Sequence, residues 1–179
     1  KTDQGTGRIG TGEAFNPYQV NIATDVMNFR LSSCNEGQSP AYGVVVTDQL
    51  GSEFDERDLA VNPPAVSIGT TPLSSGIDYT IATPARGGEM QISLQDSAPI
   101  HPGECLFVDY DIGFHTDLTI STSWSTQARL FEYRSLPLSD PGRVYSLGDV
   151  AEVWMANLVN EEQLLKTLVS PAEATIGDE

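Results

Sequence analysis

Acidic side chains are the residues of this sequence whose type and spacing most directly suggest chemistry. Asp109 and Asp111 lie two positions apart, and Asp117 follows shortly after them. Residues two apart on a β-strand share one face, so the first two carboxylates can converge on a single ion. Ca²⁺ prefers such hard oxygen ligands. The three residues are therefore candidate calcium ligands. Solvated surface charge is the alternative, because no complete Asp-x-Asp-x-Asp-Gly loop occurs.

A second acidic cluster spans Glu53 to Asp58, with Arg57 as its one basic residue. It offers the same kind of ligand atoms. A charge run between strands is most simply a solvated loop, however, and we expect a loop here. Asp48 ends a valine-rich run, and we expect it to cap a turn.

Cys34 and Cys105 are the two cysteines of the chain. An even pair predicts a disulfide in an exported protein and two free thiols in a cytosolic one. Cys34 is in phase with Arg30 on the polar face of one expected strand, and Cys105 is in phase with Asp109 on the outward face of another. One strand ends where the other begins, so antiparallel pairing would place the sulfurs side by side. We predict the disulfide, worth about 4 kcal/mol in the chain-entropy model. Two unpaired cysteines, one of them buried, are the alternative.

Catalytic patterns are absent from the sequence. His101 and His115 are the only histidines, and neither has a second histidine or a thiolate at ligand spacing, so we do not expect a transition-metal site. No Gly-x-Ser-x-Gly elbow marks a nucleophile. Sequence spacing does not show the separation in space that a glycosidase carboxylate pair requires. We therefore expect no enzyme activity.

Aromatic side chains are candidates for sugar binding, because their rings stack on carbohydrate. Trp124 is in phase with Leu118 and Ile120, which is typical of a tryptophan in a sandwich core. Trp154 lies outside the clearest strands and is the better candidate for ligand binding, with a core position as the alternative.

Charge and composition exclude several classes of protein. The 179 residues include 25 acidic and 9 basic side chains, which gives a formal net charge of −16. A nucleic-acid partner is not expected, because such a partner requires clustered cations. No apolar run approaches 18 residues, so we expect no membrane insertion. The apolar content of 39% supports a packed core, and the length favours one domain.

Glycine and proline divide the chain into short β-branched and aromatic segments, the pattern of an all-β sandwich or barrel. The clearest alternation runs from Leu106 to Phe114, with even-numbered residues inward. Further strands are expected at 18–23, 26–34, 42–50, 65–68, 79–82, 90–94, 118–126 and 128–134, with a strand or an amphipathic turn in 144–159. We expect residues 1–17 to be a flexible leader and 18–160 to be the sandwich module. Residues 161–179 would be a linker, with 161–167 as its one helical candidate, or the start of a next repeat.

Several segments, taken in order, resemble the bacterial surface-antigen repeat family, a tandem β-sandwich module also filed as a domain of unknown function. The segments are Asp25-Val26-Met27-Asn28-Phe29, Asn35-Glu36-Gly37, Ser39-Pro40-Ala41-Tyr42, Val44-Val45-Val46-Thr47-Asp48-Gln49-Leu50, Pro102-Gly103-Glu104 and Ser135-Leu136-Pro137. They cover roughly residues 22 to 137. Residues 166–179 resemble the start of a further repeat. Thr24 departs from the family, which usually has glycine before the aspartate, and the insertion between Leu50 and Pro102 is long.

The resemblance implies an Ig-like antiparallel β-sandwich on the bacterial surface or outside the cell, without catalytic residues. We expect a structural spacer in an adhesin-like array, with neighbouring repeats of the same chain as its partners. The alternative is an adhesive module of the same fold. It would bind a glycan or a protein through the insertion at 51–98 or the Trp154 segment, with calcium as a candidate cofactor of either role.

Lysines bear on one further property of surface domains. Many such domains are stiffened by Lys-to-Asn isopeptide bonds, which need a lysine in the core. Lys1 and Lys166 are the only lysines and lie near the two ends of the chain. We therefore expect neither to be in the core, and we predict no internal crosslink.

Overall fold

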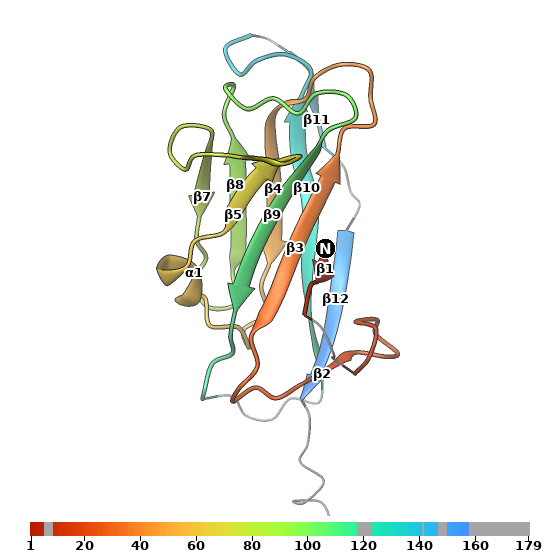
Figure 1. The fold of residues 1–179 in the computed structure, drawn as a ribbon, viewed down its shortest axis with the longest axis vertical. Helices are drawn as coiled ribbons and strands as arrows, with labels where there is room; N and C mark the ends of the chain where they lie inside the picture. Colours follow the sequence, from red (N-terminus) through yellow and green to blue (C-terminus); the bar gives the residue numbers. More distant parts are fainter. Residues whose placement is uncertain (6–8, 118–122, 141, 147–149, 158–179) are drawn as a thin grey trace, which may run out of the picture.

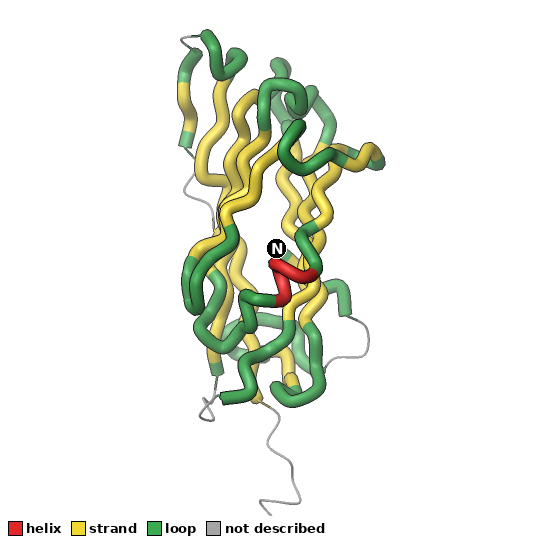
Figure 2. Tube along the Cα trace, turned by 90° about the vertical axis from the view of Figure 1, so that its left-hand side faces the viewer, coloured by secondary structure: helices red, strands yellow, loops and turns green. Residues whose placement is uncertain are grey.

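The chain folds into two facing β-sheets, as a computed structural model of residues 1–5, 9–117, 123–140, 142–146 and 150–157 shows (Figure 1). The elements, in chain order, are β1 (Thr2–Asp3), β2 (Tyr18–Val20), β3 (Met27–Cys34), β4 (Tyr42–Gln49), α1 (Asp58–Val61), β5 (Ala65–Ile68), β6 (Thr71–Pro72), β7 (Tyr79–Ala82), β8 (Glu89–Leu94), β9 (Cys105–Ile112), β10 (Trp124–Arg134), β11 (Val144–Tyr145) and β12 (Val150–Asn157). Seen from the side, the strands form two layers (Figure 2). The predicted all-β, Ig-like sandwich is confirmed.

The first sheet has five strands in the order β1-β3-β9-β5-β6, all antiparallel. Its longest strand pair is β3–β9, which stays in register from Met27↔Ile112 to Cys34↔Cys105. Alternate residues of both strands point into the core because successive strand residues face opposite sides. The inward phase predicted for residues 106 to 114 is confirmed, since Leu106, Val108, Tyr110, Ile112 and Phe114 are all buried.

The second sheet has the order β2-β12-β10-β4-β8-β7, with β11 also paired to β10. All of its pairs are antiparallel except β12–β2. Two strands were expected at 118–126 and 128–134, but the structure has the single strand β10 from Trp124 to Arg134. Residues 118–122 lie outside the described residues. The length of β10 lets β12 pair with its first half and β11 with its end.

The core lies between the two sheets and contains side chains from both. Met27, Phe29 and Ile112 are among the side chains of the first sheet that are almost fully buried, and Ile92 and Met155 are among those of the second. Trp124 is also in this core, as its phase predicted. At about 25 cal/mol per Å² of apolar surface, such burial is the dominant stabilising contribution.

The first residues do not form the flexible leader expected over 1–17. Thr2 and Asp3 pair with Arg30 and Phe29 as an edge strand of the first sheet. β2 begins at Tyr18, and the module bounds 18–160 stay a prediction. The expectation for residues 161–179 lies outside the described residues.

The acidic segment 53–58 is only partly the solvated loop that its charges suggested. Phe54 is 1% exposed, and a short helix, α1, follows the segment and buries Leu59. The chain crosses here from β4 of one sheet to β5 of the other, with α1 beside the two layers (Figure 2). Phe54 and Leu59 are buried at this end of the sandwich, and the four carboxylates of the segment are half-buried around them.

Candidate functional site

The disulfide predicted from strand phase is present between Cys34 and Cys105. The two residues are direct partners in the register of β3 and β9, at the end of one strand and the start of the other. The bond joins positions 71 residues apart in sequence. It therefore fixes the end of the first sheet at which the chain turns through Asn35 to Pro40.

A buried ion pair joins the first residue of the chain to the centre of the second sheet. The Lys1 ammonium donates to both carboxylate oxygens of Asp48, at 2.8 and 2.6 Å. Both side chains are fully buried. Nζ also donates to the Tyr110 hydroxyl at 2.9 Å and to Thr126 Oγ1 at 2.8 Å. Because Lys1 directly precedes β1, and β4, β9 and β10 supply the other groups, one polar cluster links both sheets.

The two buried charges, the Lys1 ammonium and the Asp48 carboxylate, are compensated by each other and by neighbouring polar groups. The Tyr110 hydroxyl donates to Asp48, and Thr126 Oγ1 lies 3.1 Å from Asp48 Oδ1 and 2.8 Å from the Gln49 carbonyl oxygen, so its one proton has two acceptors in reach. The Lys1 ammonium lies 3.9 Å from the centre of the Phe29 ring, a favourable cation–π position. Burial lowers the pKa of Lys1 to about 8, against the opposing attraction of Asp48. Burial and the Asp48 charge raise the pKa of Tyr110 well above its usual value, so its hydroxyl stays protonated as a donor.

Two expectations about these residues are wrong. Asp48 does not cap a turn, because it lies within β4 and is fully buried. Lys1 lies in the core although it is at the end of the sequence. The hydrogen-bond partners of its Nζ are Asp48, Tyr110 and Thr126, and none of these is an asparagine. The alternation of β4 could have predicted the burial of Asp48, since Asp48 shares a face with Val44 and Val46. A buried carboxylate needs a partner such as a buried cation.

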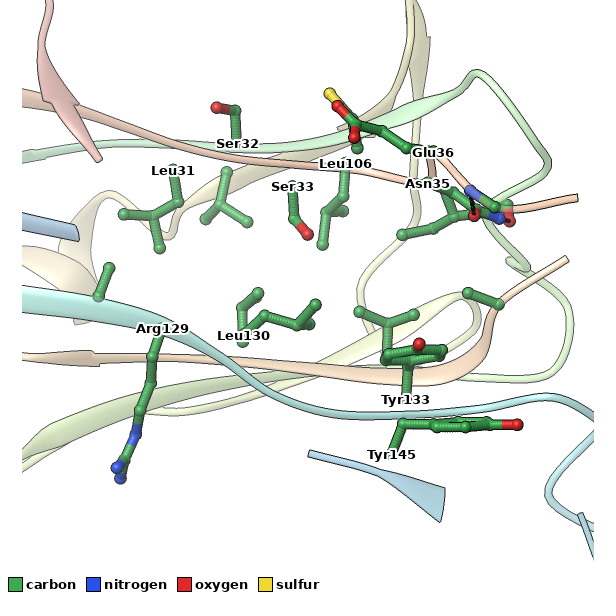
Figure 3. Close-up of a pocket in the computed structure, with 18 of the residues that line it drawn as sticks. Leu31, Ser32, Ser33, Asn35, Glu36, Leu106, Arg129, Leu130, Tyr133 and Tyr145 are labelled. Carbon is green, nitrogen blue, oxygen red and sulfur yellow. Dashed lines mark hydrogen bonds between the residues drawn. The ribbon is translucent and has the colours of Figure 1, made fainter. Parts of the chain in front are cut away.

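Next to the ion pair, the two sheets separate into a groove of about 800 Å³. Leu31 and Ser33 point into it from β3, and Leu130 points into it from β10, while Ser32 and Arg129 point away (Figure 3). Further apolar walls come from Val44, Val46, Ile100, Leu106, Val108 and Ala128, and Lys1 also lines the space. Nothing in the sequence marked this groove, because it depends on how far the two sheets diverge.

Two tyrosines lie at one side of the groove. Tyr133 of β10 and Tyr145 of β11 stack with ring centres 4.9 Å apart and planes inclined by 15° (Figure 3). Tyr145 is 37% exposed. A stacked pair with one face toward solvent can bind an apolar or sugar-like surface.

The C-terminal half of β3 borders the same groove. On one side β3 pairs with β9 over its whole length, but on the other side β1 reaches only Phe29 and Arg30. From Leu31 to Cys34, this second edge has no partner strand among the described residues. The groove therefore has apolar walls, and the C-terminal half of β3 forms one of its margins.

The three candidate calcium ligands have other partners in the structure. Asp109 accepts two hydrogen bonds from the Arg30 guanidinium, at 2.6 and 2.8 Å. Asp111 accepts one from the Asn28 amide at 2.7 Å, and Asp117 accepts one from Arg86 at 2.9 Å. Arg86 also lowers the pKa of Asp117. Asp109 and Asp111 lie on one strand face as predicted, but each carboxylate is engaged in its own cross-strand bond.

A different group of possible metal-ligand atoms lies in the segments that contain Phe54 and Phe114. Among the described residues, the oxygen and nitrogen ligand atoms of Asp55, Glu56 and His115 lie within 4.8 Å of one another. His115 Nε2 is 2.9 Å from Glu56 Oε2, and Asp55 forms an ion pair with Arg57. The Arg57 bond lowers the pKa of Asp55. His115 and Glu56 are thus paired with each other, and Asp55 is paired with Arg57.

Trp154, the candidate ligand residue, lies on β12 and is half-buried. Its neighbours Val153 and Met155 face the core, so Trp154 faces the outer side of the second sheet. Its side chain hydrogen-bonds Glu152, which helps the Gln127 bond to lower the pKa of that carboxyl. Trp154 is therefore separated from the groove by the sheet itself.

Comparison with known proteins shows which fold this is. No protein-family model matches the chain, and no curated protein matches it. Among solved structures, it is similar to the major pilin SpaD from Corynebacterium diphtheriae, with 18% identity and a TM-score of 0.54 over 76% of this chain and 32% of that one. The major pilin subunit BcpA of Bacillus cereus has 12% identity and a TM-score of 0.53 over 78% of this chain and 36% of that one. The chain shares its fold with domains of bacterial major pilins.

A third similar structure is the 35 kDa C-terminal fragment of the major pilin GBS80 of Streptococcus agalactiae, with 12% identity and a TM-score of 0.50 over 75% of this chain and 50% of that one. The chain thus spans about a third to a half of the length of these pilin structures. Among the described residues, no helix is long and apolar enough to cross a membrane.

Proposed function

We propose that this chain is a non-enzymatic structural module, a spacer, of a large cell-surface or secreted bacterial protein. The observation that carries the proposal is the shared fold with domains of three bacterial major pilins. A structural module must keep its shape within a larger assembly. A sandwich that buries its own core can extend such an assembly by a fixed length, with neighbouring repeats as its partners.

The internal links of the sandwich support a mechanical role. The Cys34–Cys105 bond closes the end of the first sheet, and the Lys1–Asp48 pair attaches the first strand to the second sheet. Both links connect elements that are distant in sequence. Such connections restrict how far the chain can extend before the whole sandwich opens.

A module exchange in the parent protein tests the spacer role. This chain would be replaced by an unrelated β-sandwich of equal length, and the adhesion of cells to their target would be measured. A spacer predicts unchanged adhesion after exchange and weaker adhesion after simple deletion, because only reach is lost. Loss of adhesion after an exchange that preserves length would contradict the proposal.

An adhesive module of the same fold is the second candidate function. The stacked pair Tyr133–Tyr145 beside the groove favours it, because that pair offers an aromatic surface to a glycan or a protein. Trp154 on the outer sheet face is the other aromatic candidate. A panel of glycans in a thermal-shift assay separates the functions: a rise in melting temperature that Tyr145→Ala abolishes supports binding, and an unchanged temperature throughout supports the spacer.

Calcium dependence of either function stays a prediction. Binding at Asp109 and Asp111 would have to compete with Arg30 and Asn28 for the carboxylates. Melting curves in EDTA and in millimolar Ca²⁺ test the site directly. A higher melting temperature with calcium that Asp111→Asn removes would support it, and identical curves would remove calcium from both proposals.

A further inference from the structure

An imidazole and two carboxylates meet beside the segment that crosses from one sheet to the other. Among the described residues, Asp55, Glu56 and His115 each place one ligand atom within 4.8 Å of the other two. His115 distinguishes this group from acidic residues gathered on a surface, because its side chain is only 10% exposed and its Nε2 lies 2.9 Å from Glu56 Oε2. The two carboxylates are also largely buried. Imidazole nitrogen and carboxylate oxygen are the ligands that divalent transition metals take in proteins.

Backbone hydrogen bonds hold together the two segments that carry these side chains. Phe54 and Phe114 form an antiparallel bridge, and their rings stack in the core. Asp55 N donates to a carbonyl of the His115 segment at 3.1 Å, and His115 N donates to a carbonyl of the Asp55 segment at 2.9 Å. The core therefore fixes the backbone beside the ligands, and small side-chain rotations are enough to close the group around an ion.

We propose that Asp55, Glu56 and His115 bind one divalent transition-metal ion of the zinc class. An imidazole nitrogen suits Zn²⁺, whereas Ca²⁺ takes oxygen ligands and more of them. Three protein ligands leave the fourth position of a tetrahedral ion for water or for a group of a partner molecule. The inference goes beyond the spacer function and does not depend on it.

The distances between the ligand atoms are close to those around a bound ion. Ligands that lie about 2.0–2.1 Å from a tetrahedral Zn²⁺ are about 3.4 Å from one another. His115 Nε2 and Glu56 Oε2 are 2.9 Å apart, and the ligand atoms of all three residues lie within 4.8 Å of one another. The ion takes the place of the proton between Nε2 and Oε2, which is released to solvent, and the ligand atoms move by about 1 Å.

Arg57 competes with the ion for Asp55. Its guanidinium donates to both carboxylate oxygens, at 2.7 and 2.5 Å, and its side chain is 72% exposed. Because an exposed ion pair contributes little to stability, Arg57 can be displaced into solvent. Glu53 and Asp58 add negative charge to the same segment, so the local field favours a cation.

The test uses the full chain, in which only two histidines have to be distinguished. ¹H–¹⁵N spectra of the imidazoles at neutral pH separate His115 from His101, which is exposed. We expect Zn²⁺ to shift the His115 nitrogens, to saturate at about one equivalent and to leave His101 unchanged. Ca²⁺ should leave both imidazoles unchanged. Zn²⁺ should also raise the melting temperature, because it binds the native state alone.

Two matched pairs of variants separate ligation from charge. His115→Gln should weaken zinc binding at least about tenfold in calorimetry, and His101→Gln should leave it unchanged. Glu56→Gln should also weaken binding at least about tenfold, whereas Glu53→Gln, which removes the same charge from the same segment, should have little effect. Melting curves without zinc check that each variant folds.

A third pair predicts a change of the opposite sign. Arg57→Gln releases Asp55 and should tighten zinc binding. Arg86→Gln removes the same charge from a residue that is paired with Asp117, and it should tighten binding less.

Three results would overturn the proposal. They are His115 nitrogens that do not shift at an about tenfold excess of Zn²⁺, equal effects of both members of a pair, and equal responses to Zn²⁺ and Ca²⁺. The spectrum of the native sequence decides alone if a variant does not fold. None of these outcomes affects the module exchange that tests the spacer function.

Discussion

The interior of the sandwich is filled by aromatic rings at one end, the closed end, and contains the groove at the other, the open end. At the end near α1, Phe54 stacks on Phe114 with ring centres 5.2 Å apart, and Phe114 meets the edge of Trp124 at 5.9 Å. These side chains come from loops and from the start of β10, and all are buried. At the other end, the sheets diverge around the groove, and the disulfide holds the margin of one sheet.

The two ends therefore depend on different interactions: aromatic packing at one end, and a disulfide and an ion pair at the other. The closed end is stabilised by aromatic rings that fill the space between the sheets. The open end lacks such a plug among the described residues and is delimited by two specific links, Cys34–Cys105 and Lys1–Asp48. Variants that remove one kind of support should therefore affect the two ends differently.

Loss of the buried carboxylate should have the largest effect. Asp48→Ala leaves the Lys1 ammonium and the Tyr110 hydroxyl without their shared acceptor, whereas the Thr126 hydroxyl keeps the Gln49 carbonyl oxygen. We expect the free energy of unfolding to fall by about 4–5 kcal/mol, because an uncompensated buried charge remains. Urea unfolding followed by fluorescence measures the change.

A double variant separates pairing from packing at this site. Lys1→Met with Asp48→Leu removes both charges and retains similar volume, so it should recover most of the stability lost in Asp48→Ala. If Asp48→Ala alone costs less than about 1 kcal/mol, in the range of a surface ion pair, the pair does not link the two sheets in solution.

Removal of the disulfide should affect the open end more than the closed end. The double variant Cys34→Ala with Cys105→Ala should lower the free energy of unfolding by about 4 kcal/mol in the chain-entropy model. Amide hydrogen exchange should show the loss of protection concentrated in β3 and β9 near the groove, with the amides around Phe54 least affected. Uniform loss along both strands would contradict the distinction between the ends.

Truncation of the aromatic plug tests the closed end. Phe54 contacts Phe29 and Phe114 and is almost fully buried, so Phe54→Ala should cost about 3–4 kcal/mol by leaving a cavity. Tyr145→Ala is the matched change at the open end, where the ring is partly exposed, and should cost about 1 kcal/mol or less. Equal costs measured by urea unfolding would mean that both ends depend on aromatic packing.

The elements that could be predicted from sequence are those with a strict period. The phase of residues 106 to 114 predicts the inward face of β9 and, with the phase of β3, predicts that Cys34 lies beside Cys105, as the register shows. The bounds of β5 and β7 also agree with expectation, because turn residues delimit both strands. Local periodicity is sufficient for such features.

The features that were missed depend on contacts between distant segments. Lys1 and Asp48 are 47 residues apart, and position at the end of a chain says nothing about burial once β1 joins an edge. Phe54 stands in an acidic run whose composition favours a loop, and only the crossover between sheets places its ring in the core. The groove follows from the divergence of the sheets, which no single segment encodes.

The pH dependence of stability tests the ion pair without removing it. Burial lowers the pKa of Lys1 to about 8, whereas an exposed lysine in the unfolded chain titrates near 10.5. Between these values the unfolded state binds more protons than the native state, so the free energy of unfolding rises with pH. The gain from this one group is about 2 kcal/mol between pH 7.5 and 9.5.

Above pH 10 the contribution of Tyr110 has the opposite sign. Its pKa is raised in the native state, so the unfolded state loses the phenolic proton first and stability falls. The measurement is therefore confined to pH 7.5–9.5, with Lys1→Met/Asp48→Leu as the control that lacks the titrating lysine. Unfolding titrations should give a steeper rise for the native sequence than for the control. Parallel curves would show that the pKa of Lys1 is not lowered in the native state.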